Sequence, residues 1–506
     1  MRIVVIGSGF GGLSAAIRLQ AQGHSVTVVE KQGQPGGRAA VFRQDGFIFD
    51  AGPTILTAPW MLEDLFAISG RTMADYVELR PIDPFYTIRF QDGSAFHCTA
   101  DEDALVRQIA AFEPRDVAGY RRLRAAMDRI YDTGFPLVDK PFTTVKDMLR
   151  VAPDLVRLRA YQSVAALVNR HLRDPRLRQV FSFHPLLIGG NPFDTTSIYG
   201  LIHTLEMRGG VWFATGGTGA LVAALCTLFR DTGGVLRLDT PVTRIETDPH
   251  TRRATAVHTA AGDRIEADAV VSNADVASTY LQLVDRRVRR HNTDRRIRGL
   301  RYSMSLFVLY FGTDRRYEDI AHHEILMGPR YEALLADIFG QRPLSDDFSL
   351  YLHRPTATDR TLAPEGCDAF YVLSPVPHLG APIDWSAAAV PFRNAIVRDL
   401  EERYLPGLSS HIVTERVVDP RYFRDALGSH LGSAFSVQPI LTQSAWFRPH
   451  NVSEDVPNLY LVGAGTHPGA GVPGVIASGK IVADMIGPAA THGDAERFDE
   501  ARVALA

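Results

Sequence analysis

The chain opens with a short apolar run, a glycine-rich turn and an amphipathic stretch. Met1–Ile6 has the length of a buried strand, and Leu13–Gln22 repeats its apolar residues with the period of a helix. A second apolar run, Ser25–Val29, leads directly to the acidic residue Glu30. This order predicts a strand–helix–strand unit at the start of the chain.

The turn between the first strand and the helix carries glycines at the spacing that a dinucleotide requires. Gly7 permits the tight turn, Gly9 lets the backbone approach a pyrophosphate, and Gly12 allows the helix to pack closely on the strand. The helix N-terminus then offers free N–H groups to the phosphates. Glu30 is placed to accept hydrogen bonds from ribose hydroxyls and to repel a 2′-phosphate. We therefore expect a bound dinucleotide other than NADP.

Two further segments decide between NAD and FAD. Pro35–Arg38 and Phe49–Thr54 combine glycines with an arginine whose planar fork suits phosphate oxygens. Near the far end, Leu459–Val462 predicts a strand and Gly474–Met485 a helix, with a glycine-rich turn between them. A plain NAD dehydrogenase has no need of this second turn, so we predict tightly bound FAD. The further cofactor contacts expected are Gly37, Arg38, Gly52, Pro53, Thr54, Gly463, Gly465, Pro473, Gly474 and Val475. Val242 is either an adenine contact or a core valine.

Composition narrows the class of protein. The 506 residues are 45% hydrophobic and 22% charged, which is ordinary for a soluble protein of two or three domains. The net charge of −3 gives no global case for nucleic acid. Cys98, Cys226 and Cys367 are too few and too dispersed for a disulfide framework or a metal cluster, and they suit a reducing cytoplasm. We expect neither a membrane-spanning segment nor a signal peptide.

The order of the elements predicts an α/β fold in which the nucleotide domain is interrupted. We expect a discontinuous Rossmann-like FAD-binding domain, an inserted mixed-sheet substrate domain and a helical membrane-facing segment. The FAD-binding domain is assigned to 1–72, 212–285 and 451–490, the substrate domain to 73–99 and 286–450, the helical segment to 100–211, and a C-terminal tail to 491–506. Helices are expected at Asp101–Ala111, Asp116–Tyr131 and Leu155–Leu172, and later strands at Ser305–Tyr310, Phe348–Leu352 and Phe370–Leu373.

Two basic tracts have two interpretations each. Lys146–Arg178 holds eight basic and three acidic residues among apolar ones, which fits either a surface resting on an anionic bilayer or a solvated helical face. Arg286–Arg301 holds eight arginines and is either a headgroup contact or a solvated connector. Neither tract interleaves aromatic residues in the manner of nucleic-acid-binding proteins, so we discount nucleic acid. We expect no metal at His322-His323-Glu324, because adjacent residues do not converge on one ion.

The motifs together resemble those of the carotenoid desaturases of the flavin amine oxidase superfamily, above all the bacterial-type phytoene desaturases. The resemblance spans essentially the whole chain and is carried by the opening glycine turn, Pro35–Arg38, Phe49–Thr54, Phe181–Phe193, Gly432–Ser436, Leu441–His450 and Leu459–Val475. It implies FAD as the sole redox cofactor, 15-cis-phytoene as substrate and lycopene as the usual product. It also implies peripheral attachment to the bacterial cell membrane from the cytoplasm. Oxygen and a quinone both remain open as electron acceptor.

Desaturation needs a hydride acceptor, which flavin provides, and a group that takes a proton. Members of the family carry an acid and an arginine in a segment like Asp147–Arg150. The resemblance therefore implies an acid/base role for Asp147 and an orienting or charge-stabilising role for Arg150. The same two residues also fit an ordinary helix start with an ion pair three residues apart. His184 and His203 are either proton shuttles or core histidines.

Three alternatives remain at this stage. One is a desaturase, isomerase or ketolase that acts on another carotenoid, such as a C30 or hydroxylated one. Another is a flavin amine oxidase. The third is a lipid-carrying protein that has kept the architecture and lost the flavin; the intact glycine turns and Glu30 argue against it.

Overall fold

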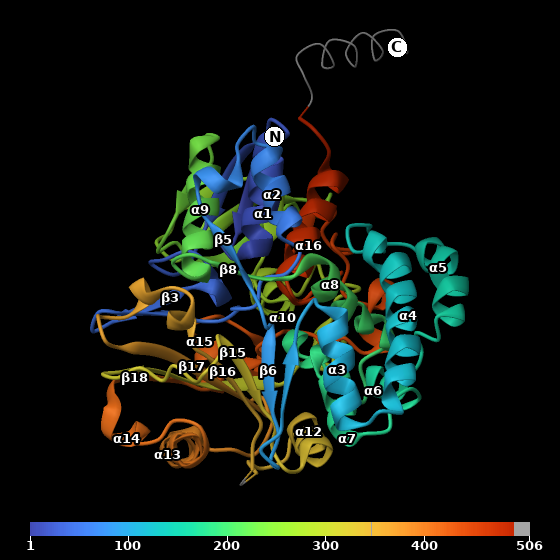
Figure 1. Ribbon diagram of the computed structural model, residues 1–506. Helices are drawn as coiled ribbons and strands as arrows, with labels where there is room; N and C mark the ends of the chain where they lie inside the picture. Colours follow the sequence, from blue (N-terminus) through green and yellow to red (C-terminus); the bar gives the residue numbers. More distant parts are fainter. Residues whose placement is uncertain (346, 490–506) are drawn as a thin grey trace, which may run out of the picture.

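A computed structural model describes residues 1–345 and 347–489 (Figure 1). The expected tail, 491–506, lies outside the described residues. The nucleotide-binding layer is a five-stranded parallel sheet of order β19-β13-β1-β2-β9. Its strands are β1 (Arg2–Ile6), β2 (Ser25–Val29), β9 (Val235–Arg237), β13 (Ala269–Ser272) and β19 (Leu459–Leu461). The predicted discontinuous Rossmann-like layer is confirmed, since segments far apart in sequence meet in one sheet.

Helices α1 (Phe10–Ala21) and α16 (Val472–Ile486) lie side by side against this sheet, and α9 (Thr218–Asp231) packs on the other flank of α1 (Figure 1). The contact between α1 and α16 is unusually close. A side-chain carbon at Gly479 would lie 2.6 Å from the hydroxyl of Ser14 and 2.7 Å from the backbone nitrogen of Ala15. The Ser14 hydroxyl donates a hydrogen bond to the carbonyl oxygen of Ile476, at 2.8 Å. The two ends of the chain are joined by this contact.

The substrate domain is built on a seven-stranded mixed sheet of order β18-β14-β17-β16-β15-β6-β7. Its strands are β6 (Tyr86–Arg89), β7 (Ala95–Cys98), β14 (Ser305–Thr313), β15 (His323–Leu326), β16 (Leu350–His353), β17 (Asp368–Val376) and β18 (Ile412–Val418). Every residue of β14 is buried, which explains why this segment reads as a continuous apolar run. Helices α12 (Tyr331–Phe339) and α13 (Trp385–Arg403) pack against opposite faces of this sheet.

Smaller sheets connect the two layers. They are the antiparallel set β10 (Val242–Thr247), β11 (Ala254–Thr259) and β12 (Arg264–Glu266), the hairpin β3 (Val41–Gln44) with β4 (Phe47–Asp50), and the pair β5 (Leu79–Ile82) with β8 (Val211–Ala214). In the last pair, a strand from before the helical segment is joined to the strand that follows it.

The helical segment contains α3 (Glu102–Phe112), α4 (Asp116–Gly134), α5 (Val145–Arg157), α6 (Val164–Asn169), α7 (Pro175–Ser182) and α8 (Leu201–Gly209) (Figure 1). The predicted single helix Leu155–Leu172 is wrong. Helix α5 ends at Arg157, Arg159 adopts a left-handed backbone conformation with φ of 55°, and Ser163 then caps α6. Within the described residues, none of the helices combines the length and apolarity needed to cross a membrane.

We expect Gly479→Ala to destabilise the protein by about 1–3 kcal/mol, because the added carbon must displace the backbone of α1. This loss outweighs the gain in helix propensity of about 1 kcal/mol that alanine brings. Gly200→Ala is the matched control, because its new carbon would lie 3.5 Å from the nearest atom, in Met127. Urea denaturation measures both variants. Equal stability of the two would contradict the close-contact explanation.

Candidate functional site

A cavity of about 650 Å³ lies where the five-stranded sheet, the seven-stranded sheet and the helical segment meet. One end is lined by the glycine turns from both ends of the chain. The other end is lined mainly by apolar side chains, among them Leu201, Leu205, Leu306 and Leu373. A site for a polar dinucleotide and a site for an apolar molecule are therefore parts of one continuous space.

The predicted cofactor residues gather in this cavity. Fourteen of the fifteen line it: Gly7, Gly9, Glu30, Gly37, Arg38, Gly52, Pro53, Thr54, Val242, Gly463, Gly465, Pro473, Gly474 and Val475. Gly12 does not line the cavity and instead lies behind it. A side-chain carbon on Gly12 would collide with the carbonyl oxygen of Gly7, so this glycine permits the close helix–strand packing that the sequence predicted.

Glu30 is held rigidly at the carboxyl end of β2. Its Oε2 atom accepts hydrogen bonds from the backbone nitrogen of Ser8 at 2.9 Å and from the Ser8 hydroxyl at 2.8 Å. Its Oε1 atom accepts a further bond from the backbone nitrogen of Gln32, at 3.0 Å. The carboxylate is buried at the cavity wall, and its remaining lone pairs can accept hydrogen bonds from the hydroxyls of a ribose.

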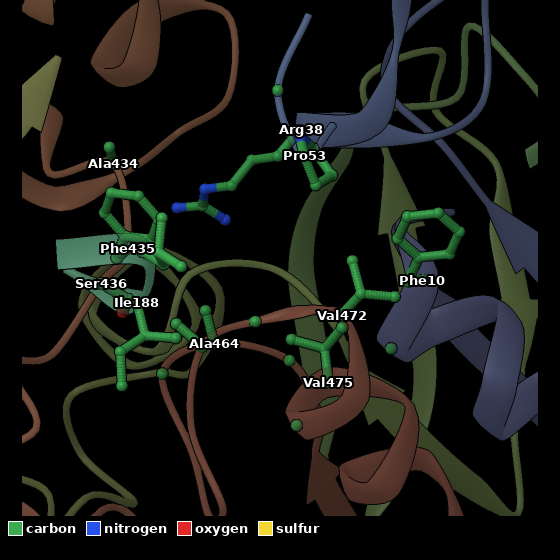
Figure 2. A pocket seen from close by; sticks show the side chains of 18 of the residues that line it. Phe10, Arg38, Pro53, Ile188, Ala434, Phe435, Ser436, Ala464, Val472 and Val475 are labelled. Atoms are coloured by element: carbon green, nitrogen blue, oxygen red, sulfur yellow. The ribbon is translucent and has the colours of Figure 1, made fainter. Parts of the chain in front are cut away.

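Arg38 brings a positive charge into the cavity. Figure 2 shows its guanidinium reaching from beside Pro53 toward Phe435. Nη2 donates to the Ser429 hydroxyl at 2.6 Å, whereas the buried Nε has no hydrogen-bond partner within the described chain. Burial lowers the pKa of Arg38, and the negative charge of Asp275 opposes that shift. A buried guanidinium with an unpaired donor beside glycine turns fits an anionic dinucleotide such as FAD.

The C-terminal turn is supported by a residue whose role the sequence did not reveal. Arg448 is fully buried, and its guanidinium donates to the carbonyl oxygens of Thr466 at 3.0 Å and Ala464 at 2.6 Å. It also donates to the carbonyls of Gln443 and Val437. These bonds join the turn before α16 to the preceding chain, so that Ala464, Val472 and Val475 form one wall of the site (Figure 2).

Asn273 is a second residue that sequence reasoning missed. It follows β13, and its side chain lies against the opening glycine turn and against Gly463. No spacing rule marks an asparagine in this place. It is recognised only when the two turns are seen to share one edge of the sheet.

The apolar end of the cavity, which we call the apolar arm, contains one buried carboxylate, on α8. Glu206 lines the cavity with Leu201, Ile202 and Leu205, and only 2% of its surface is exposed. The Tyr86 hydroxyl donates to its Oε1 at 2.6 Å, and Nε2 of His184 lies 3.2 Å from its Oε2. The pattern of the sequence offers no signal for Glu206, because it is a single acid that belongs to no recognised motif.

The structure does not place Asp147 or Arg150 in the cavity. Asp147 forms the capping box of α5, where its Oδ2 accepts from the Thr144 nitrogen at 2.9 Å and the Thr144 hydroxyl at 2.8 Å. Partial burial alone would raise the pKa of Asp147, but these hydrogen bonds outweigh that effect and lower the pKa. Arg150 is exposed, and it is Met148 and Val151 that line the cavity. The geometry thus matches the helix-start interpretation of this pair.

Three buried histidines meet beside the cavity wall. Pairing of β15 with β16 sets His353 opposite His323, and one ring nitrogen from each of His322, His323 and His353 lies within 4.8 Å of the others. Two adjacent residues, His322 and His323, therefore do bring ring nitrogens close together, contrary to the argument from adjacency, with His353 and not Glu324 as the third member. The rings of His323 and His353 are stacked with their planes 19° apart, so their in-plane lone pairs run alongside each other instead of converging. We assign no metal to this cluster.

The basic tract Arg286–Arg301 is largely a fixed connector. Arg289 is buried and lies 2.7 Å from the carboxylate of Asp294. Asp455 accepts hydrogen bonds from the backbone nitrogens of Arg290, His291 and Asn292. These contacts hold the backbone of the tract in place, whereas its arginines other than Arg289 are exposed.

We expect Arg38→Gln to bind FAD at least tenfold more weakly, because a charged donor at the cavity is replaced by a neutral one. A hydrogen bond to a charged group contributes about 1.5–3 kcal/mol, and 1.4 kcal/mol is a factor of ten in affinity. The flavin-to-protein absorbance ratio after exhaustive dialysis measures the loss. Arg43→Gln, on the exposed side of β3, is the matched control. Equal flavin retention in the two variants would argue against Arg38 as a cofactor ligand.

Comparison with known proteins agrees with this geometry. A family profile described as flavin containing amine oxidoreductase matches residues 10–487. The chain is 51% identical to a lycopene-forming phytoene desaturase of Pseudescherichia vulneris, over 96% of this chain and 99% of the relative. It is 46% identical to a neurosporene-forming phytoene desaturase of Cereibacter sphaeroides, over 96% of this chain and 94% of the relative.

Solved structures show the same fold at low sequence identity. Putrescine oxidase bound to putrescine has a TM-score of 0.64 at 14% identity and covers 96% of this chain and 99% of its own. Cyclohexylamine oxidase from Brevibacterium oxydans has a TM-score of 0.61 at 16% identity and covers 96% and 98%. The predicted FAD cofactor is confirmed by the family and by the residues present. The chain belongs to the flavin containing amine oxidoreductase family.

Proposed function

We propose that this protein is an FAD-dependent desaturase that introduces successive C–C double bonds into 15-cis-phytoene, with lycopene as the product. One observation carries the proposal: the part of the cavity that is lined by the two glycine turns continues directly into a part lined by apolar side chains. The named activities of the relatives that match nearly the whole chain support it. An amine substrate is less favoured, because the relatives that match nearly the whole chain are named as phytoene desaturases.

FAD supplies a hydride acceptor when it is bound in this cavity. The residues of the chain do the rest. Because a hydrocarbon offers no polar group, walls such as Leu205, Leu306 and Leu373 bind it by removing it from water. The same walls fix which of its bonds would lie beside the cofactor.

Helix α5 is the basis for a second part of the proposal, which concerns the membrane. Val145, Leu149 and Val156 are 53–65% exposed on its outer face, whereas Met148 and Leu155 line the cavity on its inner face. The helix is therefore a thin wall between the cavity and the outside. An apolar substrate dissolved in a bilayer would enter most directly past such a wall.

The surroundings of α5 favour an anionic lipid surface. Lys146, Arg150, Arg157 and Arg159 are exposed along the helix or just beyond it. Phe447, in the short helix that packs against α5, is 44% exposed. Apolar side chains flanked by basic ones suit peripheral binding to headgroups without insertion of a span. We place the protein in the bacterial cytoplasm, attached to the cell membrane by this surface, with oxygen or a membrane quinone as electron acceptor.

The first test is anaerobic incubation with phytoene in liposomes. We expect the flavin absorbance to bleach while the absorbance of a longer polyene appears, because hydrogen leaves the hydrocarbon for the cofactor. Oxygen and a quinone, added separately, then show which of them restores the oxidised flavin. Putrescine and C30 or hydroxylated carotenoids are parallel substrates. A flavin that stays oxidised with phytoene but bleaches with one of these would replace the proposed substrate.

The second test measures vesicle binding. We expect the double variant Leu149→Gln, Val156→Gln to bind anionic vesicles at least tenfold more weakly in co-sedimentation, since burying each such side chain contributes about 1.5–3 kcal/mol. Val390→Gln is the control, because Val390 is 67% exposed on the distant helix α13. FAD content should not change in either variant. Undiminished binding of the double variant would rule out α5 as the docking surface.

A further inference from the structure

Three carboxylates line the cavity within the described part of the chain: those of Glu30, Asp275 and Glu206. Glu30 is bonded to Ser8 at the nucleotide end. Asp275 caps the short helix after β13 and acts electrostatically on Arg38. Glu206 alone belongs to the apolar arm, where α8 contributes it beside Leu201 and Leu205.

The burial of Glu206 is energetically unfavourable for a charged side chain. A buried carboxylate loses hydration that only ion pairs or hydrogen bonds restore. In the described residues no lysine or arginine lies within 4.0 Å of it, and its partners are the Tyr86 hydroxyl at 2.6 Å and His184 Nε2 at 3.2 Å. Burial, and then the charge of Glu206, raise the pKa of Tyr86 well above its usual range, so this phenol stays protonated and donates.

The reaction needs a group of this kind. Each desaturation breaks two C–H bonds on neighbouring carbons. One hydrogen leaves with its electron pair as hydride to the flavin, and the other leaves as a proton while its electron pair becomes the new π bond. The proton acceptor must reach the hydrocarbon inside the apolar arm, where water is excluded.

We propose that the carboxylate of Glu206 accepts this proton, with Tyr86 and His184 as positioning residues. The inference rests on the desaturase function proposed above. The carboxylate oxygen takes the proton, and no other co-reactant is consumed. His184 also packs against His203, with ring centroids 5.8 Å apart, which helps to fix its ring beside Glu206. Asp147, the third residue of α5, is bonded to Thr144 in the capping box and does not line the cavity.

The decisive experiment compares Glu206→Gln with Asp147→Asn in anaerobic single-turnover reduction of the bound flavin by liposomal phytoene. We expect Glu206→Gln to slow flavin reduction at least a hundredfold, the usual scale for loss of a general base. Asp147→Asn should stay within about threefold of the wild-type rate, since it changes only the capping box at the start of α5. Both variants must retain FAD and be reduced by dithionite at the wild-type rate.

Further variants separate a catalytic role from a structural one. Glu206→Asp keeps a carboxylate and should recover part of the rate that Glu206→Gln loses, whereas a packing role would not favour aspartate. Tyr86→Phe should lower the flavin reduction rate without raising the phytoene concentration that gives half the maximal rate. If Glu206→Gln reduces its flavin rapidly, or Asp147→Asn does so slowly, the assignment of Glu206 is overturned while the proposed function stands. A wild-type flavin that phytoene does not reduce overturns the proposed function and this assignment with it.

Discussion

Helices α1 and α16 approach so closely that no side chain fits between them at Gly479. This contact sets the position of both glycine turns, because each turn leads directly into one of the two helices. With the helices side by side on one parallel sheet, both N-termini face the same edge of that sheet. Positive helix ends and free N–H groups from the two ends of the chain therefore converge on one cofactor.

The discontinuity of the nucleotide domain follows from this arrangement. Since β1 and β19 must lie in one sheet, the intervening chain has to leave the layer and return to it. It leaves to build the seven-stranded sheet and the helical segment, and the cavity is the space that these three units enclose. Continuity between the cofactor site and the apolar arm is thus a consequence of topology.

Local pattern accounts for much of the fold and of the cofactor site. The glycine turns, Glu30 and Arg38 could be predicted because a short segment with a fixed spacing performs each task. Helix Leu155–Leu172 could not, since its break at Arg159 depends on a backbone conformation that apolar periodicity does not encode. Asn273 and Arg448 act between segments distant in sequence, so only the folded chain reveals them. The domain boundaries remain predictions.

In the segment around α5, the residues that line the cavity are not the ones that the motif indicates. Its resemblance to a catalytic segment drew attention to Asp147 and Arg150, yet both belong to the helix start and the exposed side. The residues between and after them, Met148 and Val151, face the cavity. With apolar groups on both faces, α5 is a thin wall between the cavity and the outside. Its sequence is then constrained by the position of that wall, while Glu206, proposed above as the proton acceptor, is almost fully buried on α8.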